Sequence, residues 1–95
     1  MQEMNISAED NQIQEMRIAI DAIDREITSL LETRLDLARE IGYLKARDGV
    51  PILDEKREEK VIEHLLVNIR NSSLAPAMMR IYEKIMDESK QVQNS

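Results

Sequence analysis

The sequence predicts an all-α protein of three helices, one very long and two shorter, whose chains pair into a homodimer. Among 95 residues there are only two glycines and two prolines. A β-sandwich or barrel needs a turn about every 8 to 12 residues, so this chain has too few turn-forming residues for either. Apolar residues instead recur at spacings of three and four, which is typical of helices with one buried face.

The long helix is predicted over about residues 8 to 47. Ser7, followed three residues later by Asp10, is a suitable N-cap, and Asp48-Gly49-Val50-Pro51 is a strong stop signal. Such a helix would be roughly 60 Å long. Its apolar seam comprises Ile13, Met16, Ile20, Ile23, Ile27, Leu30, Leu37, Ile41 and Leu44.

Two shorter helices follow. The first is predicted from Asp54, as the N-cap, to about Asn68. The second is predicted from about Ala75 to Gln91 or beyond, with Pro76 near its first position, where the missing N–H costs nothing. Their apolar stripes are Val61, Ile62, Leu65, Leu66 and Ile69, and then Met78, Ile81, Tyr82, Ile85 and Met86.

The long helix predicts a dimer. A 95-residue globule has a radius of gyration of about 12 Å, so helices of about 15 and 17 residues cannot cover the whole seam. We therefore expect a second chain to bury it. Residues 1–10 carry Glu3, Glu9 and Asp10 and are interpreted as an N-terminal extension that need not be ordered.

Composition excludes several classes of protein. The chain has no cysteine, so a disulfide scaffold and thiolate chemistry are excluded. A net charge of −6 argues against nucleic acid as a partner. Neither a basic and apolar leader nor an apolar run of 18 residues is present, which predicts a cytoplasmic protein with no membrane contact.

Two cations interrupt the long helix's apolar face. Arg34 occupies a seam position, and Lys45 lies 11 residues later, which on a helix is within roughly 20° of the same direction. Between them, Ala38 and Ile41 would leave a hollow about 16 Å long. Taken singly, Arg34 could be a buried ion pair and Lys45 a solvated residue near a helix end.

The shorter helices carry polar residues at equivalent places. Arg57 continues the inward face of the second helix at its start, while Asp54 and Glu58 are also explained as a cap and a surface ion pair. On the third helix, Ser89 and Gln93 follow the stripe at spacings of four, although a fraying end would also account for them.

Arg17 is adjacent to the seam near the start of the long helix. It is about 25 Å along the axis from Arg34 and roughly 100° around it, so the two cannot meet within one chain. An antiparallel helix of a partner chain would bring Arg17 to the hollow.

Residues 11 to 93 resemble the all-α chorismate mutases of the AroQ class, and residues 11–95 are interpreted as a domain of that kind. The resemblance is a spaced set covering almost the whole chain. The matching segments are Met16-Arg17, Ile20–Asp24, Leu30–Arg34, Ile41–Lys45, Pro51–Asp54, Arg57-Glu58, Ser89 and Gln93.

The resemblance implies an isomerase of the shikimate pathway that converts chorismate to prephenate for phenylalanine and tyrosine synthesis, in an intertwined homodimer with shared sites and without cofactor or metal. It implies that Arg34 and Arg17 of the partner subunit hold the substrate carboxylates. Lys45 and Gln93 would donate to the ether oxygen, and Glu58 would accept from the ring hydroxyl. The other residues implied to line the pocket are Asp54, Arg57 and Ser89.

The residue types agree with a concerted [3,3] rearrangement, which needs no nucleophile or redox group. The single histidine, His64, is expected on the surface of the second helix. An isochorismate pyruvate lyase-like enzyme remains an alternative, as does a non-catalytic helical dimerisation module. The chain could also be part of a longer polypeptide or associate with another enzyme of the pathway.

Overall fold

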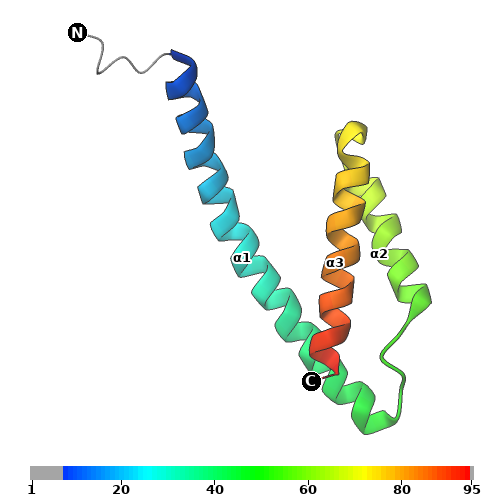
Figure 1. Ribbon diagram of the computed structural model, residues 1–95. Coiled ribbons are helices and arrows are strands. Elements are labelled where there is room, and N and C mark those ends of the chain that lie inside the picture. Colours follow the sequence, from blue (N-terminus) through cyan, green and yellow to red (C-terminus); the bar gives the residue numbers. More distant parts are fainter. Residues whose placement is uncertain (1–7, 95) are drawn as a thin grey trace. The chain divides into compact units, whose positions relative to one another are not determined.

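The computed structural model describes residues 8–94, with side chains from Asp10 onward. The helices are α1 (Ala8–Asp48), α2 (Glu55–Asn68) and α3 (Ala75–Gln93), and a short 3₁₀ turn, η1 (Ser72–Leu74), precedes α3 (Figure 1). Within residues 8–94 there is no strand. The predicted all-α class, with one very long and two shorter helices, is confirmed.

The chain divides into two compact units, with the boundary between Thr33 and Arg34. The described part of the first unit is the N-terminal portion of α1, residues 8–33, so Ala8–Asp10 of the expected extension are helical. The predicted N-cap Ser7 lies outside the described residues. Along this portion the apolar seam is exposed: Ile13 46%, Met16 64%, Ile20 53%, Ile23 53%, Ile27 45% and Leu30 69%.

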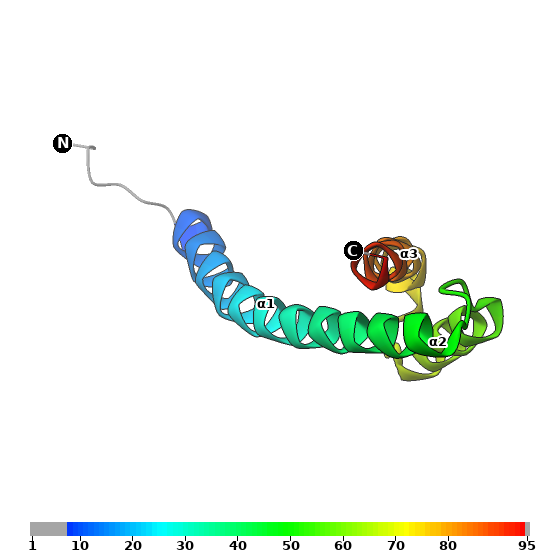
Figure 2. The same cartoon turned by 90° about the horizontal axis from the view of Figure 1, so that it is seen from below.

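The second unit contains the end of α1 together with α2, η1 and α3. Helices α2 and α3 run antiparallel beside each other and are joined through η1 (Figures 1 and 2). Its core is small, because only Ala38 and Leu65 are buried apolar side chains in the described part of the chain, and Ser89 is buried with them. The other large apolar side chains of this unit in the described part of the chain are half-buried or exposed.

Helix α1 ends as the sequence predicts. Gly49 has a φ of 68°, a left-handed conformation that residues with a Cβ rarely adopt. The Val50 N–H then donates to the Lys45 carbonyl at 2.8 Å, and the Gly49 N–H donates to the Ala46 carbonyl at 3.4 Å. This closing motif satisfies carbonyls of the last helical turn and turns the chain toward α2.

The starts of the two shorter helices are also confirmed. The carboxylate of Asp54 accepts from the Arg57 N–H at 3.0 Å, which makes Asp54 the N-cap of α2. Pro76 lies in the first turn of α3. Helix α3 continues to Gln93, so the last predicted polar residue is helical.

None of the helices in the described part of the chain is both long enough and apolar enough to cross a membrane.

Candidate active site

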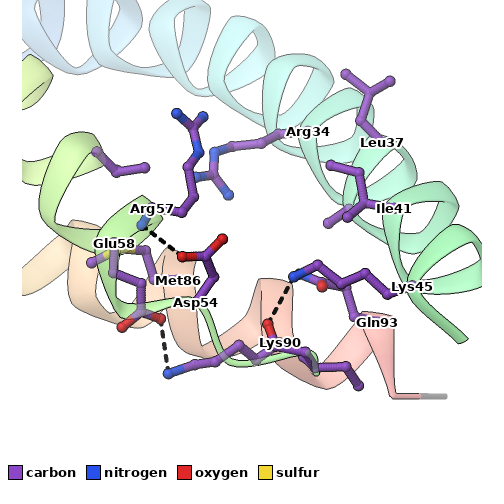
Figure 3. Close-up of a pocket in the computed structure, with 13 residues that line it drawn as sticks. Arg34, Leu37, Ile41, Lys45, Asp54, Arg57, Glu58, Met86, Lys90 and Gln93 are labelled. Carbon is purple, nitrogen blue, oxygen red and sulfur yellow. Dashed lines mark hydrogen bonds and ion pairs between the residues drawn. The ribbon is translucent and has the colours of Figure 1, made fainter. Parts of the chain in front are cut away.

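The second unit contains a cavity of about 270 Å³, near the lower end of the size range of small-molecule pockets, roughly 300 Å³. Side chains from α1, from the segment before α2, and from α2 and α3 gather around it (Figure 3). Its lining combines apolar side chains with four cations and two carboxylates. The lining residues are Arg34, Leu37, Ala38, Ile41, Lys45, Ile52, Asp54, Arg57, Glu58, Val61, Met86, Lys90 and Gln93.

Arg34 is held by the buried hydroxyl of Ser89. The Arg34 Nη1 donates to Ser89 Oγ at 2.6 Å, and Ser89 Oγ donates in turn to the Ile85 carbonyl at 2.8 Å. A guanidinium has five N–H donors in a planar fork, so this one bond orients Arg34 and leaves donors for a ligand. Ser89 thus acts behind Arg34 and is not itself part of the cavity lining.

Lys45 is held by the chain that follows α1. Its Nζ donates to the carbonyl of Ile52 at 2.8 Å. An ammonium has three N–H donors, so this bond positions the group without using up its donors. Lys45 and Arg34 both line the cavity, with Ala38 and Ile41 between them, which confirms the hollow expected from their helical spacing.

The start of α2 contributes Asp54, Arg57 and Glu58 to the lining, as expected. The carboxylates of Asp54 and Glu58 differ in what they contact. Asp54 Oδ1 accepts from the Arg57 backbone N–H as a helix cap, whereas Glu58 Oε2 forms an ion pair with Lys90 Nζ at 3.0 Å. Asp54 thus contacts the backbone, whereas Glu58 contacts the side chain of Lys90, another residue of the cavity.

Lys90 is a lining residue that the sequence interpretation missed. Its Nζ also lies 3.6 Å from Asp87 Oδ1. The hydrogen bond to Glu58 raises the pKa of Lys90 above its ordinary value, and the charges of Glu58 and Asp87 raise it further, while partial desolvation lowers it. Lys90 is therefore cationic at neutral pH. The signal was present in the sequence, because Lys90 follows Met86 on the apolar stripe by four residues.

Gln93 reaches the cavity from the last turn of α3. Its Oε1 is buried and has no hydrogen-bond partner among the described residues. The backbone of Gln93 lies against Gly42 of α1 so closely that a Cβ at residue 42 would be 2.6 Å from the Gln93 Cα. The absence of a side chain at Gly42 therefore allows Gln93 to approach α1.

Arg17 belongs to the first unit and is exposed. It is not part of the lining described above, and it lines a shallow hollow with Ile13 and Gln14. Its expected role as a residue of the partner subunit stays a prediction. His64 is exposed on α2, as expected. Within the described part of the chain, no group of three or more His, Cys, Asp or Glu side chains could hold a metal ion.

Residues 16–94 match the model of a protein family described as chorismate mutase type II. A solved structure of a conserved hypothetical protein from Pyrococcus furiosus has a TM-score of 0.72 with this chain at 39% sequence identity. That similarity covers 86% of this chain and 95% of the other. The segment that matches the family model, residues 16–94, includes every residue that lines the cavity.

Two relatives differ in length and in the compound they are named for. A bifunctional chorismate mutase/prephenate dehydratase from Aquifex aeolicus is 40% identical over 55 residues, which are 58% of this chain and 15% of that protein. A 4-amino-4-deoxychorismate mutase from Streptomyces venezuelae is 26% identical over 87 residues, 90% of this chain and 84% of that protein. This chain therefore spans less than a fifth of the bifunctional relative.

Proposed function

The chain belongs to the chorismate mutase type II family, and on that basis we propose that it isomerises chorismate to prephenate in the cavity of the second unit. The observation that carries the proposal is that seven of the expected polar residues meet at one place. Six line the cavity, and the seventh, Ser89, orients one of them. The six lining residues are Arg34, Lys45, Asp54, Arg57, Glu58 and Gln93.

Binding of the substrate depends on cations. Chorismate carries two carboxylates, and Arg34 binds one of them with the guanidinium donors that Ser89 leaves free. Arg57 lines the same cavity and adds positive charge. The second carboxylate is bound by Arg17 of the partner subunit, so the complete site requires a dimer.

Catalysis depends on donors placed at the ether oxygen. In the [3,3] rearrangement the bond between this oxygen and the ring breaks as a carbon–carbon bond forms, and negative charge develops on the oxygen. Lys45 is positioned by the Ile52 carbonyl, and the carboxamide of Gln93 lines the same cavity and donates its N–H₂ to the same atom. A million-fold acceleration requires about 8 kcal/mol, and each well-placed donor supplies roughly 3 to 4 kcal/mol.

Glu58 accepts a hydrogen bond from the hydroxyl at ring carbon 4. Asp54 already caps α2 through its Oδ1, and Glu58 engages Lys90 through its Oε2. The second oxygen of Glu58 can accept a bond from a neutral hydroxyl, which fixes the orientation of the ring. Together with the arginines, this contact selects the folded substrate conformer that can rearrange.

The dimer is formed by the exposed seam of α1. The six seam residues from Ile13 to Leu30 are each at least 45% exposed in the single chain. A row of this length in water marks an interaction surface, and a second copy carries the same row. We expect an antiparallel partner helix that buries this seam to bring Arg17 to the partner's cavity.

A direct turnover assay tests the proposal. Purified dimer mixed with chorismate should remove the near-ultraviolet absorbance of chorismate and yield prephenate, and replacing Lys45 with methionine should abolish this. Pyruvate and salicylate formed from isochorismate would instead identify a lyase. If neither chorismate nor isochorismate is converted, the proposed function is wrong, and a helical dimerisation module is the remaining interpretation.

The second candidate substrate is 4-amino-4-deoxychorismate, which is named in one relative and differs from chorismate by an amino group in place of the ring hydroxyl. Assaying both compounds with the same protein decides between them. We propose chorismate because Glu58, the acceptor for this substituent, is already paired with a cation.

A further inference from the structure

Lys90 is the one cation of the cavity lining to which the proposed reaction gives no task. It reaches from α3 to α2, where its Nζ lies 3.0 Å from Glu58 Oε2 (Figure 3). Both side chains are about one third exposed, 33% for Lys90 and 30% for Glu58. The pair therefore borders the cavity instead of lying on the outer surface of the helices.

The ion pair with Lys90 determines which substituent of a substrate Glu58 attracts. An unpaired carboxylate in a pocket favours a cationic substituent over a neutral one, because charge adds to hydrogen bonding. With Lys90 in contact, the negative charge of Glu58 is balanced, and its remaining hydrogen-bonding capacity suits a neutral hydroxyl equally well. Among the described residues that line the cavity, the other carboxylate is that of Asp54, whose Oδ1 caps α2.

Lys90 also repels a second cation directly. An aliphatic amine is largely protonated at neutral pH. An ammonium that donated to the second oxygen of Glu58 would lie within about 8 Å of Lys90 Nζ, which is the sum of two hydrogen-bond lengths and the spacing of the two carboxylate oxygens. At that separation two like charges repel appreciably, although exposure of the pair to solvent weakens the repulsion.

We propose that Lys90 is a specificity-determining residue, which makes the site select a hydroxyl over a protonated amine at ring carbon 4 of the substrate. This inference rests on the proposed function, since it assumes that chorismate-like compounds bind in this cavity with that substituent at Glu58. The selection between hydroxyl and amine then depends on the ion pair between Glu58 of α2 and Lys90 of α3.

The experiment measures kcat and KM for chorismate and for 4-amino-4-deoxychorismate with four proteins: wild type, Lys90→Met, Lys90→Gln and Lys90→Arg. The two neutral variants should raise the ratio of kcat/KM for the amino compound to that for chorismate by about tenfold. Most of the change should be in KM, because the substituent contacts Glu58 in both ground and transition states. Lys90→Arg keeps the charge and should keep the wild-type ratio.

The matched control is Lys84→Met on the same helix. Lys84 is 74% exposed and pairs with Glu88 at 3.3 Å, but it does not line the cavity. This variant also removes one lysine charge and one lysine–glutamate ion pair, but the pair lies within α3 and away from the cavity, so its ratio should equal that of wild type.

The outcomes separate the two proposals. If wild type converts chorismate but neither neutral variant changes the ratio, Lys90 has no selective role, and the proposed function stands. Equal losses for both compounds would show a structural role and would also overturn the inference. Wild type that prefers the amino compound would overturn both the choice of chorismate and the role of Lys90, and turnover of neither compound would overturn both proposals.

Discussion

The hydroxyl of Ser89 is a small group on which the orientation of Arg34 depends. It is 8% exposed as a residue, accepts from Arg34 Nη1 and donates to the Ile85 carbonyl. The Ile85 carbonyl lies inside α3, where the helix backbone provides it with a hydrogen bond. Loss of the Ser89 hydroxyl therefore affects mainly the Arg34 guanidinium. A cavity cation is thus positioned by a residue that itself lies behind the lining.

Replacing Ser89 with alanine should lower kcat/KM for chorismate by about tenfold. It should lower the unfolding free energy by about 1 to 2 kcal/mol, because two hydrogen bonds are lost and each typically contributes about 1 kcal/mol. Steady-state kinetics and urea unfolding measure the two effects. Ser73→Ala is the control, since Ser73 is an exposed serine of η1 whose hydroxyl makes a hydrogen bond to Asn71, away from the cavity. Equal activity of both variants would show that Arg34 does not need the Ser89 hydroxyl.

The ion pair of Lys90 has a defined pH range. The pKa of Lys90 is raised above its ordinary value of 10.5 in the folded chain, chiefly by the hydrogen bond to Glu58. A raised pKa of a base means that the pair stabilises the fold fully below the unfolded pKa, and that this stabilisation is lost as pH rises through the folded pKa.

The stability difference between wild type and Lys90→Met should therefore be constant between about pH 7 and pH 9 and should shrink above about pH 10.5. Urea unfolding at a fixed protein concentration measures it, because the stability of a dimer depends on concentration. A difference that already falls between pH 7 and pH 9 would contradict the assignment of the effect to Lys90.

At the scale of elements, the approach of α1 and α3 is decided at Gly42. A Cβ there would lie 2.6 Å from both the Cα and the carbonyl oxygen of Gln93, closer than nonbonded atoms approach. These are backbone atoms, so relief requires the last turn of α3 to move. Gly42 therefore affects both the packing of α1 against α3 and the position of Gln93, a proposed catalytic donor.

Gly42→Ala should lower kcat by about 100-fold, the size expected for losing one donor to developing negative charge. Alanine by itself favours a helix interior by about 1 kcal/mol over glycine, so a loss of activity cannot come from helix propensity. In a Gln93→Ala background the same change should have little further effect, because both act on one donor. Additive losses in the double variant would place the effect of Gly42 elsewhere.

At the scale of the whole molecule, the proposed site combines residues from two chains. Arg34, Lys45 and Gln93 line the cavity within one chain, whereas Arg17 belongs to the first unit and is outside that lining. A symmetric dimer with two shared sites follows if Arg17 serves the partner's cavity. Mixed dimers distinguish this arrangement from one in which each chain is complete.

Arg17→Ala and Lys45→Ala homodimers should each be nearly inactive. In a 1:1 mixture half of the dimers are mixed, and each has one intact site of two, so about a quarter of wild-type activity should return. Activity after unfolding and refolding the two variants together measures this, and differently tagged chains verify that heterodimers form. Heterodimers without recovered activity would rule out the shared site.

The sequence by itself determined the helices and the faces they present. The end of α1 follows from the conformational freedom of Gly49, and the start of α2 from the side chain of Asp54, which are local effects readable from one segment. The 11-residue spacing of Arg34 and Lys45 likewise placed both on one face, and the structure confirms that they share a cavity.

Only the tertiary structure decided which faces meet and at what register. The ion pair between Lys90 and Glu58, and the contact of Gly42 with Gln93, join residues 32 and 51 positions apart. Helical periodicity assigns each of these residues to a face of its own helix, but a contact between helices depends on their crossing and on how far one slides along the other. The polar set was therefore predictable from the sequence, whereas the pairing that balances the charge of Glu58 required the packed helices.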